Sequence, residues 1–276
     1  MSENKSSARE SGSSRRRAYL WLLSHKALYQ RLWGGRGAQE TPIVLFLAGS
    51  DGAASTELAA LFKRSLRTQV HPPGDPALFD GGKIRPDHEI RSLIARSHAP
   101  IMVFAVHPAS RALASLVGHF QPARALWFYE PPGYFSASLN RPGEVSAADM
   151  PDSTRQLIDR LDQSSLSGKS RDWLAWHARH MAFFDAGLDR DRSTRLVASN
   201  RLCEQPETSM REILEFAGLD GTRDLAKISK KKFQSAADSN RGSLDPDIRT
   251  ACEDLLSRLD AVEARSSGVI GHGVEE

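Results

Sequence analysis

The chain of 276 residues carries 37 Lys and Arg against 34 Asp and Glu, a net charge of +3, and about 40% of its residues are hydrophobic. This composition is ordinary for a globular protein with a substantial core, and the weakly basic balance suits an anionic small ligand but argues against a nucleic-acid partner. No run approaches the ~20 consecutive apolar residues that a membrane span needs.

The N-terminal region raises the question of export, because the run SSRRRAYLWLL (13–23) resembles a twin-arginine signal. Its apolar stretch ends at Leu23 and no small-residue cleavage site follows, so we expect a cytoplasmic protein instead. The two cysteines, Cys203 and Cys252, are far apart and lack a metal-ligand spacing. Both are expected to be buried, inert thiols in a reducing compartment.

In chain order, residues 1–14 are rich in Ser, Gly and charge, and are expected to form a disordered basic tail. Residues 15–35 follow as an amphipathic segment, in which apolar residues at helical spacing predict a helix from Arg15 to Trp33. Its three leading arginines leave two interpretations open. The helix either lies on an anionic membrane surface or packs on the domain with a solvated basic lead-in, and the second is preferred.

From residue 42 onward, predicted strands and helices alternate. Apolar runs predict strands at Ile43–Ala48, Ile101–Val106, Ala125–Tyr129 and Thr194–Ser199. Helical spacing predicts helices at Ser55–Leu66, Asp87–Ser97, Ala109–Leu116, Asp152–Gln163, Arg171–Ala186, Glu207–Ala217 and Asp245–Ala264. We therefore expect an α/β fold of three layers, αβα, with a central parallel sheet in one domain of residues 42–264, followed by a flexible tail at 265–276.

The loop after the first predicted strand has the outline of an anion site. Small residues and two hydroxyls lead from the strand into a helix: Gly49, Ser50, Gly52, Ala54, Ser55 and Thr56. The unpaired amides and the dipole at a helix N-terminus favour an anion there. However, the loop is neither a Walker A nor a GxGxxG sequence, and it carries Asp51 but no Lys or Arg. The alternative is that its small residues serve only close packing.

Three segments together resemble the sulfotransferase family. VLFLAGSDGAASTELAALF (44–62) matches the family's G-x-P-[RK]-S-G-[ST]-[ST] motif at Gly49, Ser55 and Thr56. QPARALWFYEPPGYFSASLNR (121–141) matches a second motif, in which an Arg and a Ser bind the 3′-phosphate, at Tyr129, Pro132 and Ser138. TRLVASNRLCEQPETSMREILEFAGLD (194–220) is similar to a third, and the resemblance covers residues 42–262.

The resemblance implies a fold like that of P-loop nucleotide kinases and 3′-phosphoadenosine 5′-phosphosulfate as co-substrate, without a metal. The loop Gly49–Thr56 would hold the 5′-phosphosulfate, and Ser138, Arg241 and Gly242 the 3′-phosphate. His107, in the run VHP after a strand, would remove the proton from an acceptor hydroxyl or amine. The alternative for His107 is an ordinary loop residue.

The sequence also departs from the family pattern in its charges. Asp51, Gly52 and Ala54 stand at the family's Pro, basic and Gly positions, and Glu130 replaces the phosphate-binding Arg. Each missing charge-assisted hydrogen bond is worth roughly 1.5–3 kcal/mol, so donor binding is expected to weaken by about two to four powers of ten. Cations in candidate neighbourhoods for compensation are Lys63, Arg64, Arg124, Arg141 and Arg241. The preferred interpretation of each is an ordinary surface charge.

The run RDWLAWHARHMAFFD (171–185) offers a different kind of site. His177 and His180, three residues apart, are candidate metal ligands on a helix, but no matching third ligand is evident. A core-facing aromatic stripe, also suited to wall an acceptor pocket, is the preferred interpretation.

Three functions follow as hypotheses: sulfuryl transfer from the nucleotide donor to an unknown acceptor, an impaired relative that acts as a binding or partner subunit, and another phosphate-handling enzyme such as a kinase. The missing P-loop lysine makes the last the weakest. Nothing in the sequence indicates the acceptor or an oligomeric state.

Overall fold

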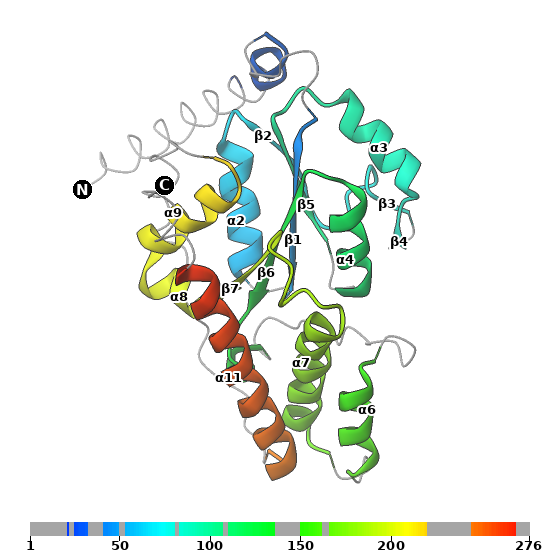
Figure 1. Cartoon of the computed structure of the whole chain (residues 1–276), viewed down its shortest axis with the longest axis vertical. Coiled ribbons are helices and arrows are strands. Elements are labelled where there is room, and N and C mark those ends of the chain that lie inside the picture. The colour runs from blue at the N-terminus through cyan, green and yellow to red at the C-terminus, as the bar shows by residue number, and fades with distance from the viewer. Residues whose placement is uncertain are drawn as a thin grey trace, which may run out of the picture.

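The computed structural model describes residues 21, 25–32, 41–49, 53–80, 83–106, 110–135, 150–161, 166–219 and 244–268. Its core is a five-stranded parallel sheet in the order β2-β5-β1-β6-β7 (Figure 1). The strands are β1 (Ile43–Gly49), β2 (Thr68–His71), β5 (Ile101–Ala105), β6 (Ala123–Tyr129) and β7 (Thr194–Ala198). A two-stranded antiparallel sheet, β3 (Phe79–Asp80) and β4 (Lys83–Ile84), lies apart from it.

Helices cover both faces of the sheet, because the central strands are apolar on both sides. Leu45 and Leu47 of β1 pack in the core against α2 (Ala53–Arg64), α8 (Ser199–Glu204) and α9 (Pro206–Phe216). Val44 and Phe46 face the opposite side, against α3 (Asp87–Arg96), α4 (Ser110–His119), α7 (Gly168–Asp185) and α11 (Pro246–Gly268). The predicted three-layer αβα fold with a central parallel sheet is confirmed.

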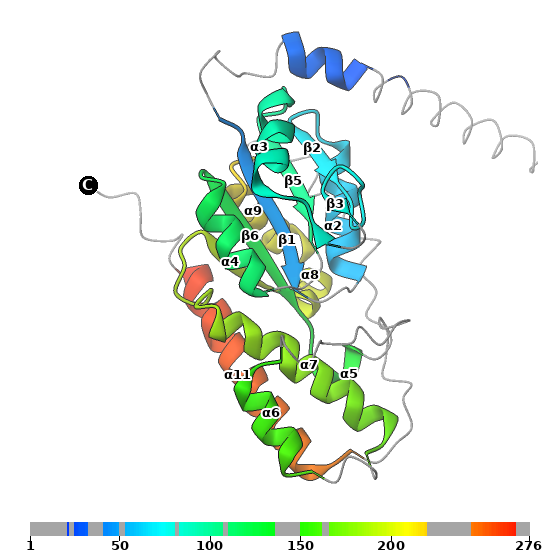
Figure 2. The ribbon, with the colours of Figure 1, turned by 90° about the vertical axis from the view of Figure 1, so that its right-hand side faces the viewer.

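Beyond the carboxyl end of the sheet the chain is helical. α7 and α11 continue past the ends of the strands, together with α6 (Asp152–Asp159) (Figures 1 and 2). The short α5 (Pro132–Phe135) follows β6 directly. None of the described helices is long and apolar enough to cross a membrane.

Most predicted elements are present, with ends that differ by a few residues. The sequence analysis missed β2, α5 and α8, and it treated as one loop the residues that include β3 and β4. The predicted flexible tail begins too early at residue 265, because α11 continues to Gly268. Residues 269–276 and the predicted tail at 1–14 lie outside the described residues. Of the thiols, Cys252 is buried as expected, whereas Cys203 is partly exposed.

The predicted N-terminal helix is described at Trp21 and at residues 25–32, and it packs on the amino end of the sheet through polar side chains. Gln30 donates from Nε2 to the carbonyls of Leu66 at 2.9 Å and Thr68 at 3.1 Å. Lys26 donates from Nζ to the carbonyl of Lys63 at 3.0 Å. Burial and the neighbouring Lys63 lower the pKa of Lys26 to about 8.

Candidate functional site

The loop after β1 starts from a position that only glycine can occupy. Gly49 has φ of +100°, and a Cβ there would lie 2.1 Å from the carbonyl oxygen of Phe128. This crowding arises because Gly49 pairs with Phe128 across the β1–β6 ladder. The central strand therefore ends in a sharp change of direction at the carboxyl edge of the sheet, where open α/β sheets bind their ligands.

α2 begins four residues later, at Ala53, and includes Ala54, Ser55 and Thr56 in its first turns. No acidic side chain lies in the first turn, so the partial positive charge of the helix N-terminus is not neutralised from within the helix. Ser55 is partly exposed and Thr56 is exposed. The strand and the helix predicted to flank an anion site are thus present in the predicted order, and residues 50–52 between them lie outside the described residues.

A cavity of about 220 Å³ opens beside this turn. Three groups of residues line it: the end of β1, one side of α2, and the ends of β2 and β5. They are Leu47, Ala48, Gly49, Ser55, Thr56, Ala59, Ala60, Lys63, Val70, Pro72, Pro73, Ala105 and Val106. The wall formed by Val70, Pro72 and Pro73 was missed from the sequence together with β2; the Pro pair after a short alternating run TQVH was the available signal.

The cavity has polar groups at its two ends and apolar groups between them. Ser55 and Thr56 lie at the start of α2, and Lys63 lies in its last turn. Eight residues of helix separate Ser55 from Lys63, which corresponds to about 12 Å along the axis. Lys63 is the only Lys or Arg in the described lining, and it sits at the end away from Gly49.

Neither Arg64 nor Arg124, the other candidate cations in the described part of the chain, lines the cavity. Arg64 is exposed at the C-terminus of α2. Arg124 lies at the amino end of β6, where its guanidinium donates to the carbonyl of Phe216 and sits 5.7 Å from the centre of that ring. Both positions agree with the preferred interpretation, in which these cations do not belong to the site. Arg141 and Arg241 lie outside the described residues.

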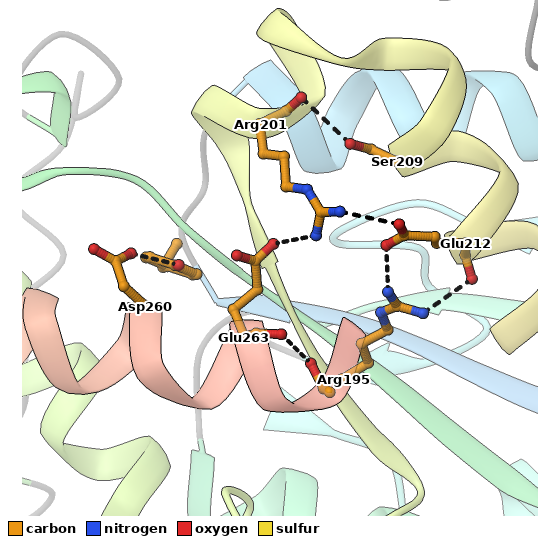
Figure 3. A network of polar contacts seen from close by, with 8 residues as sticks. Arg195, Arg201, Ser209, Glu212, Asp260 and Glu263 are labelled. Atoms are coloured by element: carbon orange, nitrogen blue, oxygen red, sulfur yellow. Dashed lines mark hydrogen bonds and ion pairs between the residues drawn. The ribbon is translucent and has the colours of Figure 1, made fainter. Parts of the chain in front are cut away.

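A cationic side chain does lie just beyond the carboxyl edge, in α8, but it is held in an ion network (Figure 3). Arg201 binds Glu212 at 2.9 Å and Glu263 at 3.1 Å, and Arg195 of β7 binds Glu212 at 2.5 Å. Two arginines and two carboxylates balance each other there. The network connects α9 and α11 to β7, so Arg201 stabilises the fold.

Glu130 comes directly after β6 and is buried. It lies two residues beyond Phe128, which pairs with Gly49, so it belongs to the same edge of the sheet. Its carbonyl accepts a hydrogen bond from Nε1 of Trp176 at 2.7 Å, which fixes this turn against α7. A carboxylate is thus built into the edge at which the family places an Arg.

Several predicted site residues lie outside the described part of the chain: Ser50, Gly52, His107, Ser138, Arg241 and Gly242. The described chain reaches Val106, the residue before His107. The amide of Val106 donates to the carbonyl of Leu47 at 2.9 Å and so extends the β1–β5 ladder. Val106 also lines the cavity. The roles of these residues stay predictions.

The aromatic stripe of α7 packs in the core. Nε1 of Trp127 donates to Nδ1 of His180 at 3.2 Å, and the ring of His180 meets that of Trp176 edge to face at 4.7 Å. His177 contacts Oγ1 of Thr154 through Nδ1 at 3.0 Å. Burial lowers the pKa of His177 to about 4 and that of His180 well below its usual value, so both are neutral. Among the described residues no three His, Cys, Asp or Glu side chains gather to hold a metal ion.

No family model matches the chain, and no curated protein matches it. Similar solved structures include a sulfotransferase from Alicyclobacillus acidocaldarius, at 13% identity over 85% of this chain and 96% of that one, with a TM-score of 0.44. Mouse sulfotransferase SULT7A1 complexed with PAP matches at 11% identity over 85% and 90% of the two chains, with a TM-score of 0.47. The sulfotransferase domain from the Curacin biosynthetic pathway matches at 8% identity over 78% and 98%, also at 0.47. All three are sulfotransferases, the family that the sequence motifs resemble.

Proposed function

We propose that this chain is a sulfotransferase-like protein that binds 3′-phosphoadenosine 5′-phosphosulfate at the loop Gly49–Thr56 and transfers its sulfuryl group to an acceptor hydroxyl or amine. The observation that carries the proposal is the cavity at the carboxyl end of the central strand, next to the N-terminus of α2 and the hydroxyls of Ser55 and Thr56. Main-chain amides and hydroxyls at such a position bind anionic oxygens without a cationic side chain.

The reaction requires a proton acceptor. The acceptor oxygen or nitrogen attacks sulfur, the bond from sulfur to the bridging phosphate oxygen breaks, and the nucleoside bisphosphate leaves. His107, which follows Val106 in the cavity wall, is our candidate for the proton transfer. The apolar middle of the cavity suits an acceptor with an apolar body.

A second candidate is an impaired relative that has the fold but not a working donor site and acts as a binding or partner subunit. Two observations favour it: Glu130 is buried at the carboxyl edge, and Lys63 stands alone as a cation in the described lining, at the end away from Gly49. A carboxylate near a phosphate dianion opposes binding. Affinity for the donor nucleotide therefore separates the two candidates.

The test is calorimetric titration with 3′-phosphoadenosine 5′-phosphate. We expect binding that weakens with salt and falls by roughly threefold to tenfold in Ser55→Ala and in Thr56→Ala, because each loses a hydrogen bond to an anion. Ser257→Ala is the matched control, since this exposed serine in α11 bonds only its own helix, at the carbonyl of Glu253. No heat at millimolar ligand refutes a donor site.

Turnover separates transfer from binding alone. Donor consumption with a panel of apolar alcohols and amines, lost in His107→Ala while nucleotide affinity stays the same, supports transfer. Nucleotide binding without donor consumption contradicts sulfuryl transfer to these acceptors. Glu130→Gln is expected to raise nucleotide affinity by roughly tenfold if this carboxylate faces the ligand.

A further inference from the structure

The N-terminal segment, Trp21 and residues 25–32, shows its apolar side to solvent. Trp21 is 62% exposed, Leu28 49% and Leu32 57%. With Tyr29, they are the large hydrophobic side chains that are exposed in the described part of the chain, and all four belong to this segment. Trp21 also stacks on His25, with the ring centres 4.2 Å apart.

An ordinary surface helix packs its apolar side on the protein, whereas this helix packs its polar side there and exposes its apolar side. Residues 21, 25, 28 and 32 recur at steps of four, three and four, which places them on one face of a helix. Lys26 and Gln30 lie on the opposite face, and these are the side chains that bond the domain at Lys63, Leu66 and Thr68. Gln30 is only 8% exposed. The polar side therefore anchors the helix to the protein, and the apolar side is left for another surface.

Charge identifies the kind of surface. The first 36 residues contain eight Lys or Arg and two acidic residues, a net charge of +6, so residues 37–276 together carry −3. Arg31 is exposed, and helical spacing puts it at the flank of the apolar face. An apolar face with basic flanks is the pattern of helices that lie on anionic lipid.

We propose that this segment docks the protein on an anionic membrane surface, with Trp21, Leu28 and Leu32 entering the interface. The helix lies at the end of the molecule opposite to α6, α7 and α11 (Figures 1 and 2). The contact is peripheral. It does not depend on the proposed function, since none of the three side chains that would enter the interface lines the cavity.

The test is sedimentation of the full chain with vesicles of phosphatidylcholine alone or mixed with phosphatidylglycerol. We expect binding to the mixed vesicles only, weakened by salt. The double variant Leu28→Gln with Leu32→Gln is expected to lower the partition coefficient by roughly tenfold or more, because two apolar side chains no longer enter the interface. Both positions are exposed, so the fold is expected to remain.

Two controls match these changes. Ala27→Gln places the same side chain in the same helix but off the apolar face, and leaves binding unchanged. Arg31→Gln weakens binding to the mixed vesicles, whereas Lys83→Gln, an equal charge loss between β3 and α3, does so much less. Equal binding to both kinds of vesicle, or no binding to either, overturns the proposal. So does a concentration-dependent dimer that Leu28→Gln with Leu32→Gln abolishes, because the occupant is then a second copy.

Discussion

The glycine at the end of β1 supports the most direct test of the site geometry. In Gly49→Ala the new Cβ would meet the carbonyl oxygen of Phe128 at 2.1 Å and its amide nitrogen at 2.6 Å. Both atoms belong to the backbone of a buried strand, so relief requires that β1 and β6 move apart at their carboxyl ends. The substitution therefore disturbs both the sheet and the start of the loop.

The expected decrease in the free energy of unfolding of Gly49→Ala has two parts. Placing a side chain at positive φ costs about 1–2 kcal/mol, and loss of one or two ladder hydrogen bonds costs about 1 kcal/mol each. The sum is about 3 kcal/mol, which for a domain of this size lowers the melting temperature by roughly 10 °C. We also expect nucleotide binding to be lost at temperatures where the variant remains folded, because the loop amides lose their direction.

Two other glycines separate the contributions. Gly74 has φ of +75° but open space around its Cβ position, so Gly74→Ala carries strain alone and is expected to lose about 1 kcal/mol. Gly118 lies in α4 with open space and no positive φ, so Gly118→Ala is expected to gain about 0.5 kcal/mol. Urea unfolding and thermal melts followed by circular dichroism measure all three. If Gly49→Ala loses no more stability than Gly74→Ala, the close approach to Phe128 is not real.

Three further predictions concern buried polar groups. The free energy of unfolding decreases as the pH falls from 6.5 towards 4, because His177 and His180 are neutral in the folded protein and take up protons on unfolding. For His177 alone the decrease is about 2 kcal/mol at pH 5. Urea unfolding midpoints measured at a series of pH values test this. Glu212→Gln lowers the free energy of unfolding by about 2 kcal/mol, since it removes a shared partner of two arginines. A thiol reagent labels Cys203 in the native protein and Cys252 only after unfolding, because burial raises the pKa of Cys252 to about 12.

Each of these has a contradicting outcome. A stability that does not change between pH 7 and pH 5, beyond the effect of exposed groups, means that both histidines stay accessible to protons. A Glu212→Gln variant as stable as the parent means that the network is loosely held. Equal labelling rates for the two thiols mean that α7 does not cover Cys252 on α11.

The centre of the fold was predictable because its signals are local. β1, β5 and β6 are apolar on both faces, and a run such as MVFAV, without polar alternation, is typical of a strand covered on both sides. β2 is an edge strand of four residues, TQVH, that pairs with β5 alone. Its sequence contains a single aliphatic side chain, Val70, so no apolar run marked it. One wall of the cavity was missed for the same reason.

The elements that flank the candidate site were predictable, and the arrangement of the charges around it was not. An apolar strand followed by small residues and a helix is a local pattern, and it predicted a strand that stops at Gly49 and a helix that contains Ser55. Arg124 looked close because it precedes a motif, but it lies at the start of β6, about 17 Å of strand from the carboxyl edge. Proximity along a sequence does not tell which end of a strand a side chain occupies. The sequence likewise did not indicate that Lys63 lies in the last turn of α2, at the end of the helix away from the loop.

α2 connects the candidate site with the N-terminal segment. Its first turn borders the cavity, while the carbonyl of Lys63 in its last turn accepts a hydrogen bond from Lys26 of the N-terminal segment. A helix of twelve residues is about 18 Å long, so the Gly49 end of the cavity and the N-terminal segment lie at opposite ends of α2. A molecule resting on lipid through Leu28 and Leu32 would therefore keep the Gly49 end of its cavity away from the membrane surface.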